Sequence, residues 1–169
     1  MSNEAFASPQ TRPVPFSATL HVRDTCLCLH AQRAARALAR HFDEALRPCG
    51  LSNGQFSLLM SLNRPDAPGM AETADVLAMD RTTLTAALKP LQRRGLVRVE
   101  ADPDDRRSRR LVLTDSGLAL LARALPIWEE SHRRVDALLA AGPGPGDAEA
   151  LRRDLRGLSG GAMGRHAGT

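Results

Sequence analysis

The 169-residue sequence predicts a mainly helical (α+β) protein with one β-hairpin, and three observations support this fold class. Apolar residues recur every three or four positions along most of the chain, which is typical of amphipathic helices. Hydrophobic residues make up 43% of the sequence but aromatic residues only 3%, so the core must consist mainly of Leu, Ala and Val. Residues 96–113 instead alternate apolar and polar positions around a turn-rich tip, the pattern of two paired strands.

The charge distribution favours an anionic partner. The net charge is +4 and the sequence pI is about 9.7, and residues 81–110 hold nine Lys or Arg against four Asp or Glu. The net charge of these residues, +5, exceeds the +4 of the whole chain, so the positive charge is concentrated here. No apolar run is long enough to cross a membrane, and the N-terminus lacks the apolar segment of a secretory signal. A cytoplasmic protein without a membrane partner is therefore expected.

The N-terminal third predicts an arm followed by a helix. Residues 1–16 contain three prolines and little apolar content, which indicates a flexible arm. Apolar residues then follow a helical spacing over residues 24–46. Asp24 is a candidate N-cap, although Ser17 or Thr19 can start the helix earlier. Pro48 and Gly50 then end it.

The middle of the chain predicts a helix, a short helix, a turn and a longer helix. Ser52 caps a helix that runs to residue 62, and residues 63–69 form a proline-containing loop. A short helix over 71–78 is followed by a helix over 81–94, which Asp80 caps and Gly95 ends. The apolar stripe of this longer helix consists of Leu84, Leu88 and Leu91. Pro90 lies inside the helix and predicts a kink.

The remaining chain predicts a hairpin and two helices. The strands flank the charged tip DPDDRRSR. Thr114 caps a long helix over 115–140, in which Pro126 predicts a bend. Glycines and prolines break the chain over 142–146, and Asp147 caps a last helix. Its apolar stripe consists of Leu151, Leu155 and Leu158.

The longer helix and the hairpin tip together indicate a device that reads DNA. A helix of this length fits the major groove, and its first residues would face base edges. Arginines at a hairpin tip suit the narrow minor groove or phosphates. One aspartate of the tip is expected to pair with an arginine, and we assign this wing-stabilising role to Asp105. The candidate DNA-binding residues are Arg81, Thr82, Thr83, Thr85, Lys89, Arg93, Arg106, Arg107 and Arg109. The alternative is a solvated basic hairpin without a partner.

The same stretch resembles the winged helix-turn-helix core of MarR-type (multiple-antibiotic-resistance) transcription regulators. The family pattern has D-x-x-D-R-R in the wing followed by L-x-L-T-x-x-G, and the sequence matches it at 102–107 and 111–117. GLSNGQFSLLMSL, residues 50–62, matches the usual preceding helix, and the resemblance covers roughly residues 24–140. One departure is Thr73, where the family usually has an apolar residue, and this is expected to loosen packing.

The resemblance implies a homodimeric repressor that binds a pseudo-palindromic DNA operator. Residues 17–50 and 114–162 would form an interlocking helical dimerisation region, and residues 51–113 the winged helix-turn-helix domain. Two winged units would then lie about one helical turn of DNA apart. Members of the family commonly release DNA when a small molecule, often an aromatic acid, binds, while others respond to cysteine oxidation.

The sequence leaves this choice of switch open. His21 and Arg23 are candidates to bind an acidic effector, together with Cys26 and Cys28. The alternative is a thiol-based redox or soft-metal sensor that uses Cys26, Cys28 or Cys49. On one continuous helix the first two cysteines would point about 200° apart and could not easily bridge, whereas a later helix start would restore a Cys-x-Cys site. The single tryptophan, Trp128, is expected in the core or dimer contact rather than as a ligand platform.

Other classes of function have less support. The sequence contains no phosphate-binding loop, nucleophile elbow, HExxH motif or catalytic acid pair, so no enzymatic activity, cofactor or metal site is assigned. A third possibility is an interaction module that has kept the fold but lost DNA binding. The intact arginine tip argues against it.

Overall fold

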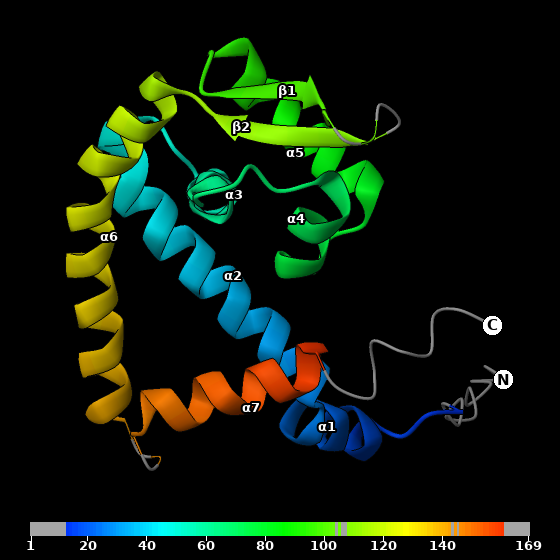
Figure 1. Cartoon of the computed structure of the whole chain (residues 1–169). Helices are drawn as coiled ribbons and strands as arrows, with labels where there is room; N and C mark the ends of the chain where they lie inside the picture. The colour runs from blue at the N-terminus through cyan, green and yellow to red at the C-terminus, as the bar shows by residue number, and fades with distance from the viewer. Residues whose placement is uncertain (1–12, 104, 106–107, 143, 145, 161–169) are drawn as a thin grey trace, which may run out of the picture. The chain divides into compact units, whose positions relative to one another are not determined.

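The computed structural model describes residues 13–103, 105, 108–142, 144 and 146–160. The chain divides into two compact units, residues 1–38 and residues 39–169, and helix α2 contributes to both. The elements in chain order are α1 Phe16–Thr25, α2 Leu27–Leu46, the 3₁₀ turn η1 Arg47–Cys49, α3 Asn53–Leu62, α4 Met70–Val76, α5 Arg81–Arg93, β1 Val97–Ala101, β2 Arg109–Leu113, α6 Asp115–Ala140 and α7 Ala148–Gly160 (Figure 1). They confirm a mainly helical chain with one two-stranded hairpin. Within the described residues, no helix is long and apolar enough to cross a membrane.

The first unit corrects the predicted helix over 24–46. The chain forms two helices, because Cys26 adopts an extended backbone (φ −72°, ψ 104°) between α1 and α2. Asp24 is not a cap, since its carboxylate pairs with Arg23 at 2.6 Å. The Sγ of Cys26 instead accepts the N–H of Leu29 at 3.5 Å at the start of α2. Apolar spacing continues across this break, so the periodicity could not reveal it.

The core of the second unit brings α3, α5, α6 and the hairpin together. Leu59 of α3, Leu84 and Leu91 of α5 and Leu111 of β2 are all fully buried. The stripe predicted for α5 is thus confirmed, with Leu88 as its third buried member. Burying such leucines stabilises the fold by about 1.5–3 kcal/mol each. Helix α5 is therefore held by one face, and its opposite face stays exposed.

Three predicted caps are confirmed by hydrogen bonds. Ser52 and Gln55 form a reciprocal capping box at the start of α3. The Thr114 hydroxyl accepts the N–H of Gly117 at 3.0 Å, and Asp147 accepts two backbone N–H groups of α7. Each cap supplies an acceptor to backbone donors that a helix start leaves unpaired. These boundaries were therefore readable from local sequence.

Thr73 does not leave an unpaired polar group in the core. Its side chain is only 1% exposed, and its hydroxyl donates to the Gly69 carbonyl at 2.9 Å. A buried hydroxyl without a partner would be costly, whereas this one is satisfied within its own helix turn.

The hairpin pairs β1 and β2 antiparallel, from Val97 opposite Leu113 to Ala101 opposite Arg109. The N–H of Leu111 also donates to the Pro68 carbonyl at 2.9 Å, in the loop before α4. Figure 1 shows the two strands beside α5, with α3 and α4 close by. The hairpin is therefore bonded to the loop before α4, and β1 follows directly after α5 in the chain.

Thr114 and Gly117 join the hairpin to α6. The Thr114 N–H donates to the Leu96 carbonyl at 3.1 Å, and its hydroxyl donates to the Gly95 carbonyl at 2.7 Å. A Cβ at Gly117 would lie 2.3 Å from the Leu96 oxygen and 2.7 Å from Cδ1 of Leu113. Only glycine therefore allows α6 to approach the hairpin this closely.

We expect Gly117→Ala to destabilise the protein by about 1–3 kcal/mol, because the methyl group overlaps a backbone oxygen. The matched control is Gly157→Ala in α7, where a Cβ meets nothing within 4 Å and alanine should add about 0.5–1 kcal/mol of helix stability. Urea denaturation measures both. Equal stability of the two variants would contradict the tight approach at Gly117.

Candidate nucleic-acid interface

The exposed face of α5 carries most of the predicted DNA-binding residues. Helical residues advance about 100° per position, so Thr82, Thr85, Lys89 and Arg93 fall within one stripe opposite the buried leucines. Ala86, which sequence reasoning did not single out, lies at one side of this stripe, about 40° from Thr82. A shallow hollow of about 380 Å³ is lined by Arg81, Thr82, Thr85, Ala86 and Lys89.

Two of the threonines on α5 also bond to the backbone or its cap. Asp80 caps the helix by accepting the Thr83 N–H at 2.8 Å, and the Thr83 hydroxyl donates to the same carboxylate at 2.6 Å. These hydrogen bonds from Thr83 hold the pKa of Asp80 below its ordinary value of 3.8. The Thr85 hydroxyl donates to the Arg81 carbonyl at 2.7 Å. Within the described residues, nothing pairs with the Thr82 hydroxyl.

The far end of α5 is also anchored. Arg94 donates to the Gly50 carbonyl at 2.8 Å, a contact that joins residues 44 positions apart. Gly95 follows with φ 68°, the left-handed conformation that favours glycine after a helix. Arg94 was not among the predicted site residues, and no local sequence signal indicates its partner.

The described part of the wing contains an ion pair of the predicted kind between Arg110 and Asp102, and the wing-stabilising role of Asp105 stays a prediction. Arg110 donates to Asp102 at 2.8 Å, while Asp105 accepts the Ser108 hydroxyl at 2.8 Å. Arg109 of the wing and Arg81 of α5 line one hollow of about 420 Å³, so the structure brings these two cations to a common surface. The predicted residues Arg106 and Arg107 lie outside the described residues.

The N-terminal candidates for effector binding lie in the first unit. His21 and Arg23 are both exposed on α1, and Arg23 pairs with Asp24. The break at Cys26 means that Cys26 and Cys28 do not share a helix, so the 200° separation no longer applies. All three cysteines are free thiols, and Cys49 is buried. Their redox or soft-metal role stays a prediction. No group of three metal-ligating side chains occurs among the described residues.

Aromatic side chains form a second feature, where α6 meets α2 and α3. Trp128 stacks with Phe42, at 6.3 Å between ring centroids, and with Phe56, at 5.9 Å. The Trp128 ring therefore packs on the core. Nearby, the buried Ser131 places its Oγ 2.8 Å from Nε2 of His41, which links α6 to α2.

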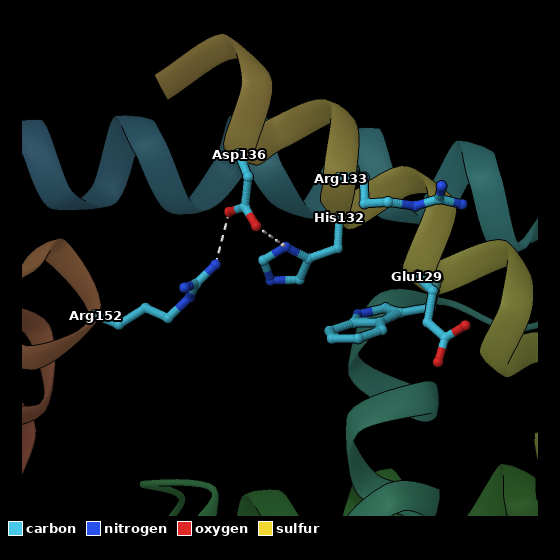
Figure 2. Close-up of a pocket in the computed structure, with 6 residues that line it drawn as sticks. Glu129, His132, Arg133, Asp136 and Arg152 are labelled. Atoms are coloured by element: carbon cyan, nitrogen blue, oxygen red, sulfur yellow. Dashed lines mark hydrogen bonds and ion pairs between the residues drawn. The ribbon is translucent and has the colours of Figure 1, made fainter. Parts of the chain in front are cut away.

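An open hollow of about 540 Å³ lies beside this cluster, between α6 and α7. It is lined by Trp128, Glu129, His132, Arg133, Asp136 and Arg152. Figure 2 shows His132 and Arg152 both directed at Asp136. Arg152 lies 2.6 Å from one carboxylate oxygen of Asp136 and Nδ1 of His132 3.5 Å from the other. The hollow thus combines an aromatic wall with two nitrogen donors, His132 and Arg152, that both contact Asp136.

Helices α4 and α5, the turn between them and the hairpin that follows define a winged helix-turn-helix protein. A model of the MarR family matches residues 51–108. The M. tuberculosis transcriptional regulator MosR, solved in complex with DNA, is 40% identical to the chain, with a TM-score of 0.70 and coverage of 83% of this chain and 98% of that one. The chain belongs to the MarR family.

Two further relatives agree with this assignment. The transcriptional regulator PecS of Dickeya dadantii is 30% identical over 106 residues, which are 61% of this chain and 64% of PecS. The match therefore covers a little less than two thirds of that curated relative. Bordetella bronchiseptica BpsR, whose DNA binding is regulated by 6-hydroxynicotinic acid, is 25% identical, with a TM-score of 0.69 and coverage of 87% and 97%.

We expect Asp80→Ala to lower the melting temperature at neutral pH, because two hydrogen bonds from Thr83 lose their acceptor. The folded-state pKa of Asp80 lies below 3.8, so its contribution is complete above that pH and is lost as the pH falls through the lower folded value. The difference in melting temperature between the variant and the parent protein should therefore become smaller below pH 3.8. Asp66→Ala, in an exposed loop, is the control. A difference that stays constant with pH would contradict the role of the carboxylate.

Proposed function

We propose that the protein is a homodimeric transcriptional repressor that inserts α5 into the major groove of a pseudo-palindromic DNA operator. The observation that carries this proposal is the α5 face, where Thr82, Thr85, Lys89 and Arg93 are exposed directly opposite the buried leucines. Both ends of the helix are anchored, so the face is held ready for a ligand. The DNA complex of MosR, which is 40% identical, supports the same partner.

The hairpin supports a second contact with the same duplex. Arg81 and Arg109 line one hollow, so a DNA backbone that follows α5 would also meet the base of the wing. Arg106 and Arg107 belong to this proposal as the arginines of the wing tip. Cations on both elements would neutralise phosphates and release counterions, which makes binding strongly dependent on salt.

Exposed apolar faces support the homodimer. Leu27 of α2 is 74% exposed and Leu138 of α6 is 70% exposed. The stripe predicted for α7 is also exposed at Leu151, Leu155 and Leu158. Side chains of this kind are typical of subunit contacts, and they lie in the segments predicted to form the dimerisation region.

The hollow between α6 and α7 is our proposed effector site, and an aromatic acid is the ligand class. The partly exposed Trp128 supplies an apolar wall of the hollow, and Arg152 and His132 can donate to a carboxylate. Asp136 already binds both donors, so an anionic ligand would compete with it for them. The regulation of BpsR by 6-hydroxynicotinic acid supports this ligand class. His21, Arg23, Cys26 and Cys28 remain proposed as N-terminal effector residues.

DNA binding is tested with a duplex selected from a random-sequence pool by the full chain. Affinity measured by fluorescence anisotropy should fall steeply with salt. Arg107→Ala should weaken binding at least tenfold and reduce the slope of log K against log salt by about one per subunit, while sedimentation shows an unchanged dimer. The control is Arg123→Ala, an exposed arginine of α6. Unchanged affinity of the Arg107 variant would refute its role, and a monomer in sedimentation would refute the homodimer. A reporter gene placed behind the selected site should be silenced.

Effector binding is tested through the fluorescence of Trp128, the only tryptophan. Titration with 6-hydroxynicotinic acid or benzoic acid should change the emission saturably and release the DNA. Arg152→Gln should weaken the acid about tenfold, because a charge-assisted hydrogen bond is lost. Arg153→Gln, the exposed neighbour outside the hollow, is the matched control. If Arg23→Gln weakens the acid and Arg152→Gln does not, the site lies at the N-terminal residues instead.

A further inference from the structure

Two small side chains, Thr85 and Ala86, lie on the exposed α5 face beside Thr82 and Lys89. Relative to Thr82, the side chains of Thr85, Ala86 and Lys89 lie at about −60°, +40° and −20° around the helix axis. Ala86 has no hydrogen-bonding group, and it lines the same hollow as Thr85 and Lys89. Thr82 and Lys89 therefore follow the midline of the face, and the small side chains of Thr85 and Ala86 flank it, where they allow close approach to base edges.

Hydrogen bonds within the helix reinforce this pattern. The Thr85 hydroxyl gives its hydrogen to the Arg81 carbonyl at 2.7 Å, so it has no hydrogen left to donate to a base, and its methyl group is free to contact an apolar group. The Thr83 hydroxyl gives its hydrogen to the Asp80 cap at 2.6 Å. Of the three threonines near the start of α5, only Thr82 keeps a hydroxyl hydrogen that no described residue accepts.

The major groove offers one apolar group to such a face, the 5-methyl group of thymine. Guanine, adenine and cytosine present only acceptors and donors there, which suit hydrogen-bonding side chains, whereas Ala and the methyl group of Thr suit the thymine methyl group. Arg81, about −100° from Thr82, stands at the edge of the face, and the long chain of Lys89 reaches beyond its small neighbours, so both cations can contact phosphates. The small apolar groups and the long cations are thus suited to different parts of the duplex.

We propose that Ala86 and the methyl group of Thr85 read thymine in the operator through its 5-methyl group, while Thr83 serves the helix cap and reads no base. This inference rests on the proposed DNA-binding function and makes it more specific. It names the base that the helix selects and the two residues that select it.

The test replaces single thymines of the selected duplex by deoxyuridine, which removes the methyl group and keeps the base pair and its hydrogen-bonding groups. Affinity for the parent protein should fall roughly fourfold at each thymine that meets Ala86 or Thr85, the effect of one buried methyl group. Ala86→Gly and Thr85→Ser should each abolish the difference between thymine and deoxyuridine at one position. The measured quantity is the ratio of each variant's affinity for thymine DNA to its affinity for deoxyuridine DNA. A general weakening of the helix by glycine lowers both affinities and leaves this ratio unchanged.

Thr83→Ser is the matched control, since it also removes one methyl group but keeps the hydroxyl on Asp80. For this variant, the ratio of the affinity for thymine DNA to the affinity for deoxyuridine DNA should equal that of the parent protein at every position. Tight binding to selected DNA with no effect of deoxyuridine at any position would overturn this inference and leave the proposed function standing. Discrimination that survives in both the Ala86 and the Thr85 variants would overturn the assignment to these residues. A parent protein that selects no DNA would overturn the proposed function as well.

Discussion

The hydroxyl of one threonine holds together the elements that surround the DNA-binding helix. Thr114 Oγ1 donates to the Gly95 carbonyl at the end of α5 and accepts the Gly117 N–H at the start of α6, and the Thr114 N–H donates to Leu96 at the base of the hairpin. One residue therefore fixes the end of the helix, the root of the wing and the beginning of the long helix. The arrangement is possible because Gly117 has no side chain to separate them.

Local features of the sequence were sufficient for most of this fold. A cap at Ser52 or Thr114 and a leucine stripe on α5 act within one or two helical turns, so the chain around them contains the whole signal. The same reasoning failed at Cys26. Apolar spacing continues across the break between α1 and α2, and a cysteine that accepts a hydrogen bond from a helix start is not among the usual caps.

The parts of the candidate site that depend on distant partners could not be predicted. The contact from Arg94 to Gly50 joins positions 44 apart, and the contact between His41 and Ser131 joins positions 90 apart. The pairing of Asp102 with Arg110 is a related case, because several aspartates share the tip and the sequence does not distinguish among them. The exposed face of α5 was predictable from helical periodicity. The hydrogen bonds that the Thr83 and Thr85 hydroxyls donate were not, because each hydroxyl can adopt several rotamers.

The anchoring of α5 at both ends has a mechanical consequence. Its first turn is held by Asp80, and its last turn is held by Arg94 on Gly50 and by the left-handed Gly95. A helix restrained in this way resists fraying at its ends, while Pro90 removes one backbone hydrogen bond from its interior. Gly50 lies between η1 and α3, so a force that displaces α5 against a partner would be passed to the chain just before α3.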